Sequence, residues 1–273
     1  MDELRLDDWP VGMKIVNPQQ ARNIREQGMI KQPRTSGYIH LAVEIERPHP
    51  LKKPSQKKQA IIAQVKEMAG NLADQPGVKR ADVFNAFIIP SEPEKICEEQ
   101  KREHNYDFHI ARFDLVVLVE CDDVGAAKTI RDSEAFQEIK QLFDEESDHT
   151  HCIVAKNPIC IDDVDKTRDG VFLFNYFYAD GVKNNEPDAH AVMTGVWEYT
   201  AGWWTAKANL TNSTPMQPVK GETTVYAIIN HCRWDRLLDM LPSLIFRPTL
   251  KTFVVANFTA NRIVAMPIMY RLA

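Results

Sequence analysis

The sequence predicts an α+β fold made of two successive units that share one order of elements. Residues 113–143 contain an apolar run rich in β-branched residues, followed by helix caps and an apolar helical face. The same order of strand, cap and helix returns near the C-terminus over residues 223–241. Each copy is preceded by a strand, a helix and another strand. We therefore expect two β-α-β-β-α-β repeats.

An N-terminal arm, residues 1–36, is expected before the first repeat because prolines and charges interrupt any long element there. The arm should contain at most a short helix around Pro18–Gln27. It should either wrap the body through Trp9, Ile15 and Met29 or be partly mobile.

The first repeat is expected over residues 37–161. Its first strand alternates, with Ile39, Leu41 and Val43 on one face and Tyr38 and His40 on the other. The expected elements are a strand at 38–46, a helix capped by Ser55, a strand at 78–89, a short exposed helix in the insertion 91–106, a strand at 113–119, helices capped at Asp122/Asp123 and Asp132/Ser133, and a strand at 149–160.

The second repeat is expected over residues 170–273, after a polar linker at 162–169. Its elements should repeat the order of the first half. They are a strand at 171–179, a helix opened by Glu186-Pro187, a weak strand within 206–218, a strand at 223–231, a helical pair from a cap at Asp235 through Asn257, and a strand at 262–272.

The composition excludes several classes of function. A net charge of −5 argues against a nucleic-acid-binding protein, and the basic run at 52–58 is more typical of a solvated loop. No apolar run approaches the roughly 20 residues of a membrane span. The five scattered cysteines lack C-x-x-C spacing, and the acidic start is not a secretory signal. We expect a cytoplasmic protein that binds neither nucleic acid nor membrane.

Two segments carry a resemblance to a known superfamily. Residues 121–143, with the Asp-Ser-Glu-Ala-Phe start at 132–136, and residues 201–214, with Ala-Gly-Trp-Trp and Asn-Ser-Thr, are similar to the EthD type of the dimeric α/β-barrel superfamily. The resemblance implies two ferredoxin-like units packed sheet to sheet as a pseudo-dimeric barrel on one chain, which could pair again as a homodimer. It also implies a ligand cavity between a sheet and its covering helices. Relatives include cofactor-independent monooxygenases, polyketide cyclases, lactone isomerases and two-repeat haem enzymes, so the fold alone does not fix the function.

His40 is the first candidate catalytic residue. It lies on the mixed face of the first strand, where the resemblance to the stress-responsive branch of the superfamily places a working histidine, and an imidazole can act as general base near neutral pH. Tyr38 shares that face and could polarise a substrate carbonyl. The alternative interpretation is a histidine satisfied by hydrogen bonds inside the barrel.

The second half contains more of the candidate binding residues. Phe172, Phe174, Tyr176 and Tyr178 share one face of a strand, an arrangement that is more often core than ligand site. Together with polar residues they also resemble an apolar pocket that could hold a flat ligand. The expected substrate-binding residues are Asn175, Tyr176, Trp197, Trp203, Trp204, Asn230 and His231.

Metal and cofactor sites are not expected. His149 and His151 share a strand face and could form a metal site with His40 or His109, but no acidic residue or cysteine stands at an established ligand spacing beside them. The leading hypothesis is an enzyme without a cofactor that acts on a small aromatic or polyketide-like molecule by His-assisted proton transfer or oxygen insertion. The alternatives are a haem enzyme with His231 or His190 as axial ligand, and a non-catalytic protein that binds a small molecule.

Overall fold

The computed structural model describes residues 9–21, 32–147 and 149–273. The first half contains β1 (Gly37–Val43), α1 (Gln56–Ala73), β2 (Val78–Ile88), α2 (Ser91–His104), β3 (Leu115–Cys121), α3 (Val124–Arg131), α4 (Glu134–Glu146) and β4 (Thr150–Lys156). The second half contains β5 (Val171–Ala179), α5 (Asp180–Lys183), α6 (Ala189–Ala208), β6 (Thr214–Pro218), β7 (Tyr226–Trp234), α7 (Leu237–Phe246), the π-helix η4 (Leu250–Val255), α8 (Ala256–Ala260) and β8 (Ile263–Leu272).

The strands form a closed barrel in the order β1-β3-β2-β8-β5-β7-β6-β4, and all described neighbours are antiparallel. Within each half the order is that of a ferredoxin-like unit, β4-β1-β3-β2 and β8-β5-β7-β6. The halves meet where β2 pairs with β8 and where β4 pairs with β6. The predicted fold class is therefore confirmed.

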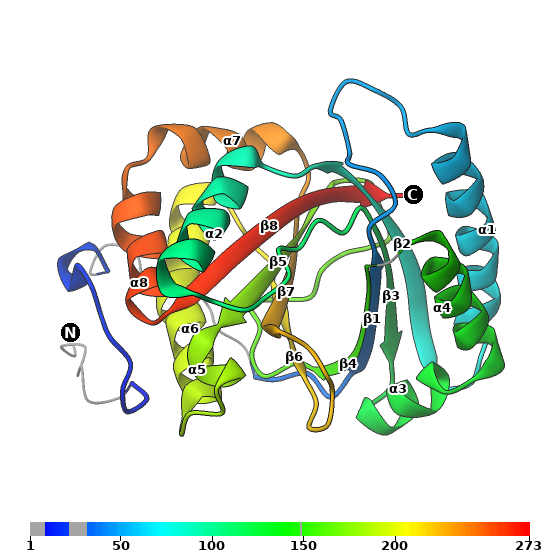
Figure 1. Cartoon of the computed structure of the whole chain (residues 1–273), viewed down its shortest axis with the longest axis horizontal. Helices are drawn as coiled ribbons and strands as arrows, with labels where there is room; N and C mark the ends of the chain where they lie inside the picture. Colours follow the sequence, from blue (N-terminus) through cyan, green and yellow to red (C-terminus); the bar gives the residue numbers. More distant parts are fainter. Residues whose placement is uncertain (1–8, 22–31, 148) are drawn as a thin grey trace.

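Helices cover the outer faces of the barrel (Figure 1). The alternation along each strand decides which side chains point inward. In β1, Ile39, Leu41 and Val43 belong to the aliphatic layer under α1, α3 and α4. Tyr38 and Ala42 belong to the cluster inside the barrel. Because successive side chains of a strand face opposite ways, His40 also points inward. The helices α6, α7 and α8 cover the second half with a layer that includes Trp197 and Trp203.

Several predicted helix starts agree with the observed caps. Ser55, Asp123 and Ser133 each accept a hydrogen bond from a backbone N–H in the first turn of α1, α3 and α4. The cap expected at Asp235 was wrong by one residue, because the N-cap of α7 is Arg236, whose backbone N–H donates to Asp239. The local sequence thus predicts the starts of α1, α3 and α4.

The insertion 91–106 forms a longer and more buried helix than expected. It is α2, which packs on β8, and its Cys97 is 1% exposed. The high charge of the insertion suggested an exposed helix, but only one side of α2 faces solvent. The apolar side of α2 packs on β8, which pairs with both β2 and β5 in the closed barrel.

Residues 9–21 of the N-terminal arm lie against the second half. Asn261 and Asn257, one helical turn apart, each form two hydrogen bonds with the arm, to the backbone N–H and C=O of Lys14 and of Val16. Trp9 contacts Tyr199 of α6 edge to face. The short helix expected around Pro18–Gln27 is a 3₁₀ turn at Pro18–Gln20, and Met29 lies outside the described residues.

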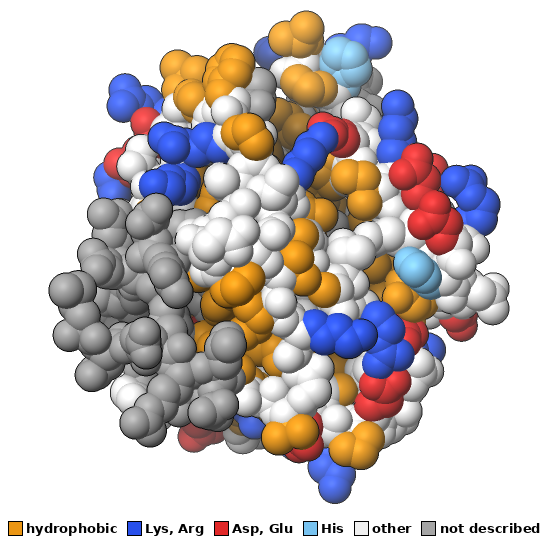
Figure 2. All heavy atoms as spheres, turned by 90° about the vertical axis from the view of Figure 1, so that its left-hand side faces the viewer, with side chains coloured by type: hydrophobic (Ala, Val, Ile, Leu, Met, Phe, Trp, Pro, Cys, Tyr) orange, Lys and Arg blue, Asp and Glu red, His pale blue; other side chains and the backbone are white. Residues whose placement is uncertain are grey.

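Figure 2 shows the face on which this arm lies, where hydrophobic side chains reach the surface between Lys and Arg side chains. A cleft of about 200 Å³ lies between the arm, α5 and the first turn of α6. Its lining contains none of the residues that the sequence selected for a site.

Candidate functional site

The interior of the barrel combines aromatic rings with two fully buried histidines and a third, His151, that is half-buried. His40 of β1 is 0% exposed and His231 of β7 is 1% exposed. His151, near the start of β4, packs edge to face against His40, with ring centroids 5.8 Å apart. The surrounding rings come mainly from the second half and are Phe84, Phe113, Phe172, Phe174, Tyr176, Tyr226 and Tyr270.

His40 meets a chain of hydroxyl groups. Its Nε2 lies 3.2 Å from the Tyr176 hydroxyl, which lies 3.3 Å from the Tyr270 hydroxyl. Tyr270 donates to the carbonyl oxygen of Phe113 at 2.6 Å. Burial, with a smaller contribution from His151, holds the pKa of His40 well below its ordinary value, and burial raises the pKa of both tyrosines. At neutral pH the site therefore contains a neutral imidazole beside two neutral hydroxyl groups.

His151 connects the interior with the mouth of the barrel. Its Nε2 lies 2.8 Å from the Thr224 hydroxyl, which belongs to the half-buried segment before β7. Burial, with a contribution from His109, lowers the pKa of His151 to about 3. The Nδ1 atoms of His40 and His151 have no hydrogen-bond partner on any other residue that the structure describes.

His231 lies deeper in the barrel, between two phenylalanine rings. It stacks on Phe174 with centroids 4.2 Å apart and is nearly parallel to Phe172 at 5.8 Å. Burial and the nearby Lys166 ammonium group hold the pKa of His231 well below its usual value. Apart from a weak contact with the Leu173 backbone, neither ring nitrogen has a hydrogen-bond partner among the described residues.

One end of the barrel is closed by charged residues and the linker that joins the halves. Glu120 accepts a hydrogen bond from Ser36 and lies 3.5 Å from the Lys166 ammonium group. Tyr38 lies at this end, near Ser36 and Glu120, and burial raises the pKa of its hydroxyl. Although Tyr38 is only two residues from His40, the hydroxyl group that meets His40 is that of Tyr176.

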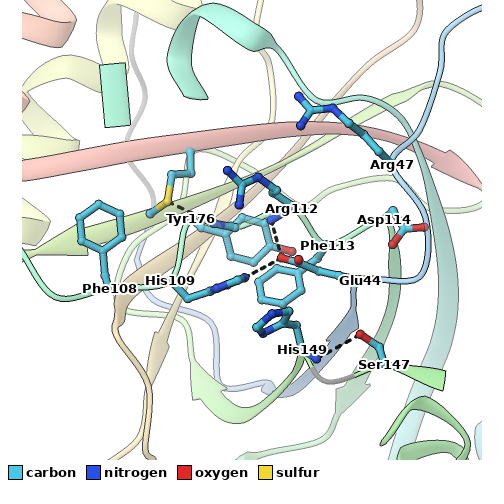
Figure 3. Close-up of polar contacts among 12 residues, drawn as sticks. Glu44, Arg47, Phe108, His109, Arg112, Phe113, Asp114, Ser147, His149 and Tyr176 are labelled. Atoms are coloured by element: carbon cyan, nitrogen blue, oxygen red, sulfur yellow. Dashed lines mark hydrogen bonds and ion pairs between the residues drawn. The ribbon is translucent and has the colours of Figure 1, made fainter. Parts of the chain in front are cut away.

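The segment 105–114 crosses the opposite end, the mouth of the barrel. There Glu44 accepts hydrogen bonds from the backbone N–H of Arg112, at 2.9 Å, and from Nε2 of His109, at 2.7 Å (Figure 3). The His109 ring stacks on His149 with centroids 4.4 Å apart. Tyr226 donates to the His109 carbonyl at 3.0 Å. This segment therefore separates the buried histidines from solvent through a small set of polar contacts.

The structure divides the predicted site residues between two faces of the sheet. Tyr38, His40, Tyr176 and His231 point into the barrel. The other predicted residues lie outside the barrel, either on α6 or on the sheet face beneath it, where Asn175 is paired in register with Asn230. Asn230 accepts a hydrogen bond from Ser213, Trp203 donates to Thr249, Trp197 is buried in the helix packing, and Trp204 packs against Trp203 and Trp234. The two groups do not form one site.

Several interior residues carry no direct signal in the sequence. Tyr270 and Tyr226 each appear as one aromatic residue in an apolar strand. The sequence suggested His151 only as a metal ligand. Alternation with Cys152 could have placed the His151 side chain on the inward face of its strand. Within the described ranges, no group of three or more His, Cys, Asp or Glu side chains is arranged to hold a metal ion.

The fold is that of dimeric α/β barrels, here with both ferredoxin-like units on one chain. Among solved structures, the chain is similar to an anthrone oxidase-like protein, with a TM-score of 0.55, 9% identity and coverage of 89% of this chain and 92% of that one. It is also similar to a protein of Fusobacterium nucleatum provisionally named a monooxygenase, with a TM-score of 0.51, 8% identity and coverage of 87% and 92%. The sequence matches no protein family and no curated protein.

The prediction that the protein works without a cofactor was wrong, because it does not follow from this fold. Chlorite dismutases are among the matching structures; one from Candidatus Nitrospira defluvii has a TM-score of 0.46, 10% identity and coverage of 88% of this chain and 92% of that one. The resemblance described above already included haem enzymes with two repeats. Because one fold can serve enzymes with and without cofactors, the fold gives no reason to expect that a cofactor is absent.

No helix within the described ranges is long and apolar enough to cross a membrane. The cytoplasmic location, the homodimer and the division into an arm and two domains stay predictions.

Proposed function

We propose that the protein is an enzyme that acts on a small aromatic or polyketide-like molecule by proton transfer inside the barrel. His40 is the base in this proposal. The observation that carries it is the state of His40, a neutral, fully buried imidazole with one nitrogen beside the Tyr176 hydroxyl and the other without a partner on another described residue.

A purely structural role leaves this arrangement unexplained. A buried polar atom without a hydrogen bond costs about 1–3 kcal/mol, and an apolar side chain at the same position would avoid that cost. The interior contains such atoms on His40, His151 and His231. Perturbed titratable groups that share one interior are typical of functional sites.

The surroundings of His40 suit a substrate with an acidic C–H group conjugated to a carbonyl. His40 would take the proton, and the negative charge would move to the carbonyl oxygen. Tyr176 and Tyr270 remain protonated because burial raises their pKa, so one of them can donate a hydrogen bond to that oxygen. In this geometry Tyr176 takes the role that the sequence suggested for Tyr38. The rings of Phe113 and Phe174 provide flat apolar walls.

The mouth of the barrel is the route of entry in this proposal. The segment 106–114 has neither helix nor strand, and its contacts with the barrel include the carbonyl groups of His109 and Phe113. Its displacement would expose Tyr176 and His151. Segments of this kind commonly open and close over buried active sites.

The fate of the deprotonated substrate separates two reaction types. Return of the proton at another carbon gives an isomerisation or cyclisation. Reaction of the carbanion with molecular oxygen gives an oxygenated product, the chemistry suggested by the names of the anthrone oxidase-like and monooxygenase-named neighbours. Both types begin with the same proton transfer to His40.

The test is turnover of anthrones, aromatic lactones and quinols by the wild type and by His40→Gln and His40→Ala, with oxygen consumption measured in parallel. Loss of the base should lower the rate by roughly 100-fold or more while leaving binding in place. The exposed His49→Gln is the control and should retain the wild-type rate. Unchanged turnover in both His40 variants would exclude the base role. Tight binding without turnover by the wild type would instead support a non-catalytic binding protein.

A further inference from the structure

Histidine rings form a continuous series from the interior of the barrel to its mouth. His40 packs against His151 with centroids 5.8 Å apart, and His151 reaches the Thr224 hydroxyl at 2.8 Å. Thr224 also accepts a hydrogen bond from the Tyr226 backbone N–H at 3.0 Å. The series thus starts at a fully buried base and ends on a half-buried hydroxyl group at the mouth.

Each histidine of the series has one ring nitrogen within hydrogen-bond distance of a hydroxyl group and one ring nitrogen without a partner on another described residue. His40 uses Nε2 for Tyr176, and His151 uses Nε2 for Thr224. In both, Nδ1 has no partner on another described residue. A ring rotation or a single water molecule can join two such atoms on rings at this separation, and buried waters usually occupy sites with two or more free polar groups.

We propose that His151 and Thr224 are a proton relay that connects His40 with solvent at the mouth of the barrel. This inference rests on the proposed function for the use of the proton, but the connection itself does not depend on any substrate. His151 and Thr224 are relay residues in this scheme, because neither needs to touch the substrate.

The protons balance over one outward and one inward transfer. Protonated His40 releases the proton that it took from the substrate, and Nδ1 of His151 accepts it. His151 releases the proton on Nε2 to the Thr224 hydroxyl, which passes its own proton to water. His40 is then neutral again and His151 has changed tautomer. A proton that returns along the same path to protonate the product restores the first tautomer of His151.

The surroundings of His151 favour this role over a second base. Its ring is enclosed by Phe113, at 5.7 Å between centroids, and Tyr226, at 5.1 Å. The nearest titratable group toward solvent is His109, held by Glu44. His151 is therefore neutral when the mouth is closed, and a neutral imidazole can accept a proton at one nitrogen while it releases another.

The experiment measures exchange of the His40 ring N–H proton with water by NMR in protein labelled with ¹⁵N-histidine. His40→Gln identifies the signal. Thr224→Val keeps the shape of the side chain and removes the hydroxyl group, His151→Phe removes the imidazole, and Thr223→Val is the matched control at the exposed neighbouring position. We expect exchange to slow by roughly tenfold or more in Thr224→Val and His151→Phe and to stay at the wild-type rate in Thr223→Val.

Exchange of the His40 ring N–H proton at the wild-type rate in Thr224→Val would overturn the relay. Equal slowing of this exchange in Thr223→Val would also overturn it, because that result would reflect opening of the barrel. If His151→Phe does not fold, Thr224→Val still decides. The measurement uses no substrate, so the relay can fail while the His40 turnover test succeeds, and the reverse. Once a substrate is known, free imidazole should restore turnover in His151→Ala, which leaves space for the imidazole ring; a purely structural role would not allow this rescue.

Discussion

The two halves of the barrel share a topology but contribute different chemistry to its interior. The first half supplies the imidazoles of His40 and His151, from β1 and β4. The second half supplies the hydroxyl groups of Tyr176 and Tyr270, from β5 and β8. Neither half contains the candidate site alone, because the contact between His40 and Tyr176 joins residues 136 positions apart in the sequence. The comparison shows that closure of the barrel creates the site.

The halves also differ in the way their outer layers are held. The first half buries an ion pair between Lys58 and Asp114, with Nζ and Oδ2 2.6 Å apart and each side chain 1% exposed. Burial raises the pKa of Asp114, and the Lys58 ammonium group opposes that rise. The outer layer of the second half depends on aromatic packing around Trp203. We therefore expect the halves to respond to different substitutions.

The largest effect should come from breaking the ion pair. Lys58→Met leaves the Asp114 carboxylate buried without its charge partner and should lower the free energy of unfolding by about 3–5 kcal/mol. Denaturant unfolding measures this loss. The double variant Lys58→Met with Asp114→Asn should recover part of it. Lys57→Met is the matched control, because the Lys57 side chain is 64% exposed and its pair with Glu146 should contribute less than about 1 kcal/mol. Equal losses in the two single variants would show that the buried Lys58–Asp114 pair contributes no more to stability than an exposed ion pair.

In the second half, Trp203→Ala should also lower the free energy of unfolding by about 3–5 kcal/mol. The reason is that the Trp203 side chain is fully buried and donates a hydrogen bond to Thr249. Thermal and denaturant unfolding measure this, with half-buried Trp204→Ala as the comparison of smaller effect. If Trp203→Ala kept its stability but lost ligand binding, Trp203 would line the ligand site, as the sequence suggested.

Acid should weaken the closed barrel through its histidines. Burial is the leading cause of the lowered pKa of His40, His151 and His231, so below pH 6.5 the unfolded chain binds more protons than the folded chain. Stability should fall as the pH falls through this range, by about 1.4 kcal/mol for each histidine at pH 5.5. Denaturant unfolding at pH 7.5, 6.5 and 5.5 measures the slope. In His231→Phe the fall should shrink by the share of one histidine; an unchanged fall would show that His231 does not remain neutral in the folded protein.

Much of the fold could be predicted because its signals are local. The first-strand alternation, the caps at Ser55, Asp123 and Ser133, and the apolar run of β5 depend on neighbours within a few residues. The burial of Cys97 in α2 could not be predicted, because it depends on packing against β8, a strand far away in the sequence. The β-rich regions show the same limit: β7 extends three residues beyond the expected His231 and β4 ends four residues before the expected Cys160.

The candidate site divides along the same line. The sequence by itself determined that His40 lies opposite Ile39 and Leu41 on its strand, and that Tyr176 lies opposite Asn175, because alternation in a strand is a property of the local backbone. Only the tertiary structure decided that the faces of His40 and Tyr176 meet inside one barrel, and that Asn175 and the tryptophans lie outside it. The physical reason is register: the order in which strands from two halves pair around a closed barrel depends on contacts between distant residues, and no local pattern encodes it.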